Sequence, residues 1–258
     1  MDSIKDLRLA VLIDADNVPY KKVKLMFEEI AKYGTPTFKR IYADWTKPTV
    51  SGWKTVLLEN AITPIQQYSY SVGKNASDSA MIIDAMDILY SGKVDGFCIV
   101  SSDSDFTRLA TRLREAGMHV IGIGEKKTLT PFITACDKFI YIEILGIDEH
   151  ADEQEEPNDT NISKKEPVNK AKSSLRKIDK SLIRVLSNSI SDLGDEDGWT
   201  FLGDLGNFIL KKHPDFDPRN YGFPKMLSLI KSINKFEVDE RETGKRNIKH
   251  VFVRVKGG

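Results

Sequence analysis

The 258-residue sequence has few cysteines and no long apolar run. Its two cysteines, Cys98 and Cys136, stand in apolar surroundings, so we expect core thiols in a reducing compartment rather than a disulfide or a metal site. No apolar run approaches the roughly 18 residues of a membrane span, and no small-residue cleavage site follows the N-terminal apolar stretch. These absences predict a cytoplasmic protein with neither a membrane partner nor a secretory signal.

An excess of charge of one sign is also absent. The 38 Lys and Arg residues balance 38 Asp and Glu residues, so the whole chain shows no sign of a polyanion partner. The balance hides a split, because residues 175–258 carry 16 bases against 12 acids. Residues 147–173 are rich in acids and almost free of large apolar side chains. We expect a disordered acidic linker there, between a domain at 1–146 and a second domain at 174–258.

Two kinds of cofactor motif are missing as well. No His or Cys cluster has the spacing of a zinc site, and no glycine-rich P-loop follows a predicted strand. Gly122-Ile123-Gly124 lacks the third glycine and the helix of a dinucleotide fingerprint.

The first 146 residues alternate between short apolar runs and amphipathic stretches. Strands are expected at 7–13, 37–42, 62–67, 97–100, 119–124 and 138–142, and helices at 21–33, 52–60, 78–90, 106–116 and 130–135. This alternation predicts an α/β domain with a mostly parallel sheet and right-handed crossovers.

The last 85 residues or so have a different pattern. Helices are expected at 175–191, 202–210 and 222–232, followed by a hairpin of strands at 235–239 and 250–256. Three helices and a terminal hairpin describe a small winged helix. Five aromatic residues of this part are expected in its core rather than on its surface: Trp199, Phe201, Phe216, Tyr221 and Phe223.

Carboxylates recur where predicted strands end or helices begin, at Asp14, Asp78, Asp103 and Asp105. If the first and fourth strands are neighbours, these acids meet at the carboxyl edge of the sheet, where open sheets hold their ligands. Several carboxylates in one place need a cation, and Mg²⁺ or Mn²⁺ suits an all-oxygen site. Such an ion can activate water for displacement at phosphorus, which is the chemistry of a nuclease. The alternative is that each acid caps a turn or a helix.

Other polar residues flank these acids. Asn17, Ser101 and Ser102 can orient a water molecule or contact a phosphate, or can simply cap a helix. Lys74 contacts a phosphate or is a solvated loop lysine. Asp84 lies about 120° around its helix from Asp78, so it need not share the site.

Three motifs carry a resemblance: LIDADN (12–17), the spacing of Lys74, Asp78 and Asp84, and VSSDSDF (100–106), with HVIGIG after it. Residues 7–145 resemble the NYN branch of the PIN-like nucleases, in particular the LabA-like bacterial group. The resemblance implies a PIN-like Rossmannoid fold and metal-dependent cleavage of RNA. It implies metal-site roles for Asp14, Asp78, Asp103 and Asp105, which we also expect to be the catalytic groups, and supporting roles for Asn17 and Ser101. The expected nucleic-acid contacts of this domain are Asn17, Lys74 and Ser101. The family commonly has glycine where this chain has Ser102.

The second domain carries two further motifs, GWTFL (198–202) and PDFDPRNYGF (214–223). It resembles the LOTUS, or OST-HTH, winged-helix module, which implies RNA binding or, in some members, a protein partner. Its basic residues form an RNA-binding stripe or a solvated surface, and the candidates for RNA contact are Arg219, Lys245 and Arg246. A homodimer is left open.

The sequence supports two hypotheses of different class. The first is a Mg²⁺- or Mn²⁺-dependent endoribonuclease whose LOTUS domain binds RNA. The second is an RNA-binding regulatory protein whose PIN-like domain is weakly active or inactive. A phosphatase is disfavoured, because the first strand ends in D-A-D-N-V rather than in D-x-D-x-T.

Overall fold

A computed structural model of the chain describes residues 6–68, 76–146, 175–242 and 249–257. The chain divides into two compact units, Met1–Leu145 and Gly146–Gly258. The predicted linker, 147–173, lies outside the described residues, so its disorder and the exact domain limits remain predictions.

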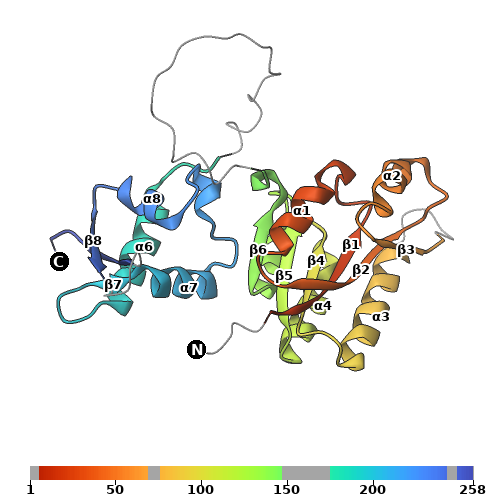
Figure 1. Ribbon diagram of the computed structural model, residues 1–258, viewed down its shortest axis with the longest axis horizontal. Coiled ribbons are helices and arrows are strands. Elements are labelled where there is room, and N and C mark those ends of the chain that lie inside the picture. The colour runs from red at the N-terminus through yellow and green to blue at the C-terminus, as the bar shows by residue number, and fades with distance from the viewer. Residues whose placement is uncertain (1–5, 69–75, 147–174, 243–248, 258) are drawn as a thin grey trace, which may run out of the picture. The chain divides into compact units, whose positions relative to one another are not determined.

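The first unit contains a sheet of six strands in which all neighbouring pairs are parallel. The strands are β1 (Arg8–Asp14), β2 (Thr35–Ala43), β3 (Thr63–Gln66), β4 (Gly96–Val100), β5 (His119–Gly124) and β6 (Lys138–Tyr141). Their order across the sheet is β3-β2-β1-β4-β5-β6 (Figure 1). The central strands β1 and β4 are apolar on both faces and almost completely buried, as expected of a sheet covered by helices on both sides. The predicted α/β architecture is confirmed.

Helices join these strands. They are α1 (Val23–Ile30), α2 (Lys54–Leu57), α3 (Ala76–Ser91), α4 (Thr107–Glu115) and α5 (Thr130–Ala135), with 3-10 turns η1 (Tyr20–Lys22), η2 (Pro48–Trp53), η3 (Ser104–Phe106) and η4 (Ile142–Ile144). Right-handed crossovers put α1 and α2 on one face of the sheet and α3, α4 and α5 on the other. The helix predicted at 52–60 is instead a 3-10 segment followed by a single α-helical turn.

The strand order reverses between β1 and β4. Ile13 pairs with Val100, so Asp14 and Ser101 leave the sheet side by side at its carboxyl edge. This confirms the expectation that the first and fourth strands are neighbours. A parallel sheet binds its ligands beyond such a reversal, because the loops on either side of it separate and leave a crevice.

The second unit is a small winged helix. Its elements are α6 (Lys180–Leu193), β7 (Thr200–Phe201), α7 (Leu202–Lys212), η7 (Pro218–Tyr221), α8 (Met226–Lys231), β8 (Phe236–Glu242) and β9 (Lys249–Val255). The antiparallel sheet has the order β7-β9-β8, so it contains a third strand that the sequence pattern did not predict. The first helix begins later than predicted, because the Asp179 carboxylate caps it by accepting the Leu182 N–H at 2.8 Å.

The aromatic residues of the second unit divide between core and surface. Phe216 is buried in the core, and Tyr221 and Phe223 pack against it. Trp199 and Phe201 are only half-buried, since buried Thr200 between them takes the inward face of β7. Their prediction as core residues was wrong. Instead, Arg254 stacks on Trp199 at 4.6 Å from the ring centroid.

Candidate metal centre

The site begins where β1 ends, at Asp14, a buried carboxylate. Ser101, the first residue after β4, donates its hydroxyl to Asp14 Oδ2 at 2.8 Å. The Asn17 side-chain amide donates to the same oxygen at 2.6 Å, and the Asp16 N–H donates to Oδ1 at 3.2 Å. Both oxygens of Asp14 are therefore held by groups of the protein.

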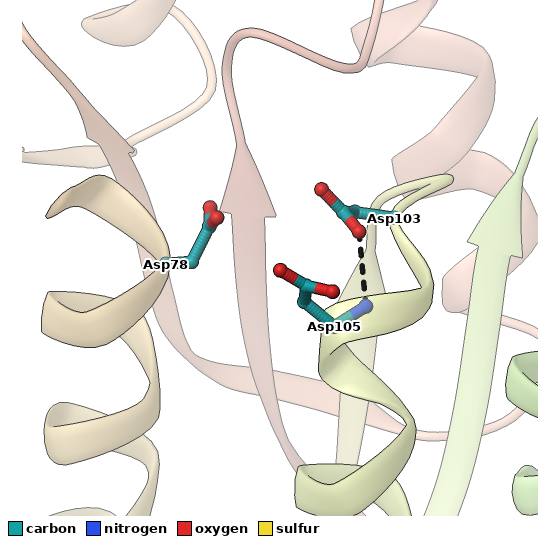
Figure 2. Close-up of side chains that lie close together, drawn as sticks. All are labelled: Asp78, Asp103 and Asp105. Carbon is teal, nitrogen blue, oxygen red and sulfur yellow. Dashed lines mark hydrogen bonds between the residues drawn. The ribbon is translucent and has the colours of Figure 1, made fainter. Parts of the chain in front are cut away.

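Ser101 continues this chain of hydrogen bonds into the acidic turn. Its Oγ accepts the Asp103 N–H at 3.0 Å while its own proton goes to Asp14. Asp103 then caps η3, because its Oδ1 accepts the Asp105 N–H at 2.9 Å, drawn as the dashed line in Figure 2. One fully buried hydroxyl thus ties the carboxylate of β1 to the turn that carries the next two acids.

Three carboxylates converge beside this turn. Asp78 enters from the first turn of α3 and faces Asp103 and Asp105 in the turn before α4 (Figure 2). One oxygen from each of the three lies within 4.8 Å of the others. Such a spacing suits joint ligation of one cation. Asp14 is not part of this group of three, although it is close enough to act on Asp78 through its charge.

The electrostatics of the site favour a cation. Burial, followed by the negative charges of Asp14, Asp103 and Asp105, raises the pKa of Asp78 to about 6. Burial also raises the pKa of Asp14, against the hydrogen bonds from Asn17 and Ser101. Each charged form is thus held at a cost that a bound divalent cation relieves. An all-carboxylate donor set fits Mg²⁺ or Mn²⁺ better than a soft metal.

The acidic turn is also attached to the next loop of the sheet edge. Ser102 Oγ accepts the Glu125 N–H at 2.8 Å, and the Ser101 N–H donates to Ile123 O at 3.0 Å. Gly124 permits this approach, because a Cβ there would lie 2.6 Å from Ser101 O. The sequence analysis did not predict the contact between Ser102 and Glu125. Its only sign in the sequence is Ser102 itself, which stands where the family commonly has glycine.

Asp84, the third residue of the Lys74-Asp78-Asp84 spacing, is used elsewhere. Its carboxylate binds the Arg40 guanidinium and the Tyr42 hydroxyl, both on β2. Burial and the hydrogen bond to Asp84 raise the pKa of Tyr42. The structure therefore resolves the open question about Asp84: it is a structural residue that fastens α3 to β2.

The expected nucleic-acid contacts divide into three groups. Lys74, Lys245 and Arg246 lie outside the described residues. Asn17 and Ser101 lie at the site, where both hydrogen-bond Asp14. Arg219 is buried, and its Nε and Nη2 bind the two oxygens of Asp217 at 3.0 and 2.8 Å. This buried ion pair gives Arg219 a structural role that requires no contact with RNA.

Other cations of the expected basic stripe have acidic partners. Lys212 pairs with Asp192, Lys231 and Lys249 both pair with Glu240, and Arg241 pairs with Asp239. Together with Arg219, five cations of the expected stripe are thus paired with acids of the same unit, and this weakens the electrostatic case for the stripe.

The parallel sheet, its reversal between β1 and β4 and the acids at that point define a PIN-like Rossmannoid domain. The NYN domain family matches residues 8–143, and the OST-HTH/LOTUS domain matches residues 173–248. The chain belongs to the NYN-domain family and carries a C-terminal LOTUS domain, as the sequence motifs indicated. It therefore joins a nuclease-like domain to a domain of an RNA-binding type.

Two similar solved structures are of uncharacterised proteins. One, a protein of unknown function from Vibrio parahaemolyticus, is 22% identical with a TM-score of 0.45, and the match covers 55% of this chain and 96% of that one. Another, from Nitrosomonas europaea, is 28% identical with a TM-score of 0.29, covering 38% and 92%. No curated protein matches the chain.

Across the described parts of the chain, no helix has both the length and the apolar character needed to cross a membrane.

Proposed function

We propose that the chain is an endoribonuclease that hydrolyses RNA phosphodiesters with Mg²⁺ or Mn²⁺ at the site formed by Asp78, Asp103 and Asp105. The observation that carries the proposal is the convergence of these three carboxylates within 4.8 Å at the sheet edge of an NYN domain. The LOTUS domain supplies RNA binding in this proposal.

The residues have distinct tasks. Asp78, Asp103 and Asp105 hold the ion from two sides, one from α3 and two from the turn before α4. When bound, a divalent ion lowers the pKa of a coordinated water and withdraws charge from the phosphate. Asp14 adds negative charge near Asp78. The Ser101 hydroxyl, which hydrogen-bonds both Asp14 and the Asp103 N–H, fixes the position of Asp14 relative to Asp103. Asn17 holds the Asp14 carboxylate from the other side.

A metal titration over a panel of RNA and DNA substrates tests the proposal. We expect cleavage of RNA that depends on Mn²⁺ or Mg²⁺ and stops with EDTA. Asp103→Asn should lower kcat/KM by at least about a hundredfold, since it removes a charged ligand while keeping the side-chain shape. Glu59→Gln is the matched control, because Glu59 is an exposed carboxylate beyond α2.

Cleavage that survives EDTA or Asp103→Asn would reject the metal-dependent mechanism. Tight RNA binding with no cleavage under any metal would instead support the second hypothesis, a regulatory RNA-binding protein.

A further inference from the structure

The face between α3 and α4 begins at the three carboxylates and continues away from them. α3 and α4 both start at the carboxyl edge of the sheet, where Asp78 and Asp105 stand (Figure 2). Seven residues after Asp105, the Arg112 Nη2 donates to the Tyr90 hydroxyl of α3 at 3.3 Å. This contact shows that the two helices lie side by side along this face.

Two arginines follow the acidic turn on the α4 side. Arg108 and Arg112 are exposed and, at helical spacing, lie on the same side of α4 as Asp105. Neither makes an ion pair with a carboxylate in the described parts of the chain, whereas many cations of the second unit do. Positive charge is therefore available here, beside the site, for an anionic ligand.

The α3 side presents apolar surface. Ile83 and Tyr90 are 64% and 73% exposed, and a spacing of seven residues puts them on one face of the helix. The face carries one carboxylate, Asp87, between them. Tyr90 lies about 18 Å along the helix from Asp78 and about 120° around it, so the apolar surface flanks the carboxylates rather than sharing their side of α3.

We propose that this α3–α4 surface, consisting of Ile83, Tyr90, Arg108 and Arg112, binds a single-stranded segment of the RNA substrate next to the bond that is cut. The inference rests on the proposed nuclease function and names the form of RNA that the site takes. Arginines suit phosphates, and an exposed aromatic ring offers a platform for an unpaired base. A base within a duplex cannot stack on Tyr90, so the surface selects single strands.

Steady-state cleavage by the full-length chain tests the surface, with an unstructured oligoribonucleotide and its duplex in Mn²⁺ at several salt concentrations. The double variant Arg108→Ala/Arg112→Ala should raise KM roughly tenfold, with a smaller effect on kcat. The plot of log(kcat/KM) against log[salt] should become flatter by about 1.4, since each single-strand phosphate contact contributes about 0.7. A purely structural role of the arginines would not change this slope.

Three further variants sharpen the test. Tyr90→Ala should raise KM without changing the salt slope, and Tyr90→Phe should recover most of the loss because the ring remains. Asp87→Lys should lower KM and steepen the slope. Lys24→Ala, which removes an exposed lysine of α1 on the other face of the sheet, is the matched control and should change neither quantity.

Unchanged KM and slope in the arginine variant would overturn the proposal. So would an altered oligomeric state in light scattering with unchanged KM, which would mark the face as a protein interface. If the wild-type chain does not cleave RNA at all, the proposed function fails separately. A photo-crosslinker, Tyr90→p-benzoylphenylalanine, then tests the surface in EDTA: a crosslink to the oligonucleotide supports it, and no crosslink rejects it.

Discussion

At the scale of single residues, Asp78 stands out among the acids of the site, because burial and the neighbouring carboxylates raise its pKa to about 6. Its pKa of about 6 means that the folded chain retains a proton which the unfolded chain has lost between about pH 4 and pH 6. Stability contributed by this group is therefore present at pH 4 and decreases as the pH rises through 6. Without metal, Asp78 at neutral pH destabilises the fold that it belongs to.

Neutralising Asp78 should consequently stabilise the metal-free protein. We expect Asp78→Asn to raise the melting temperature by a few degrees at pH 7 in EDTA and to abolish the further increase that Mn²⁺ gives the wild type. Differential scanning calorimetry with and without Mn²⁺ measures both. A lower melting temperature for the variant in EDTA would contradict the electrostatic reading.

Metal affinity should depend on pH for the same reason. Because a proton and a cation compete for Asp78, the Kd for Mn²⁺ should increase as the pH falls below about 6, approaching tenfold per unit for one displaced proton. Isothermal titration between pH 5 and pH 8 checks this. A Kd that is constant over that range would show that Asp78 is not a ligand.

At the scale of elements, the junction between the acidic turn and the β5–α5 loop has a testable strength. Ser102→Ala leaves the Glu125 N–H without its acceptor and should cost about 1 kcal/mol of unfolding free energy. Urea denaturation in EDTA measures the difference. Ser104→Ala, two residues further along the same turn, is the control, and an equal loss there would refute a specific role for the Ser102 hydroxyl.

The ion pair at the N-terminus of η7 makes a second contribution to stability that can be measured. Arg219→Ala would leave Asp217 as a buried charge with no guanidinium partner, so we expect a loss of about 3 kcal/mol or more in the stability of the second unit. The double variant Arg219→Ala/Asp217→Asn should recover part of it. A variant that keeps wild-type stability yet loses RNA affinity would restore Arg219 as an RNA contact.

The elements also show what the sequence could and could not predict. The strand that ends before Ser101 and the helix after Asp105 were predicted closely, because apolar periodicity and the acids mark them. The two-residue strand β7 was missed, since so short a segment has no periodicity of its own and forms only by pairing with β9. The partner of Arg219, a candidate RNA contact, was hidden for a related reason: the sequence shows a cation, but only the fold shows that it is buried in an ion pair with Asp217.

The positions of the candidate acids could be predicted from the sequence, but the hydrogen bonds that connect them could not. Asp14, Asp78, Asp103 and Asp105 stand at element ends that the pattern located, and β1 and β4 are neighbours as expected. The bridge through Ser101 depends on the register of two strands that are 87 residues apart in sequence, which no local pattern encodes.

At the scale of the whole molecule, the two units divide binding from cleavage in our proposal. Linking an RNA-binding domain to a nuclease raises the local concentration of substrate, which lowers KM more than it alters kcat. Deleting residues 146–258, which form their own compact unit with their own core, should therefore raise KM for RNA. Cleavage kinetics of the shortened chain measure the effect, and an unchanged KM would remove this role of the LOTUS domain.

The unfavourable charge of Asp78 in the metal-free fold has a consequence for the lifetime of the protein. A ligand that binds only the folded chain reduces the unfolded fraction in proportion to its concentration over its Kd. Proteases act on that unfolded fraction, so small changes in stability alter how much protein accumulates. If Mn²⁺ or Mg²⁺ relieves the carboxylates as proposed, the supply of that metal would govern the lifetime of the protein as well as its catalysis.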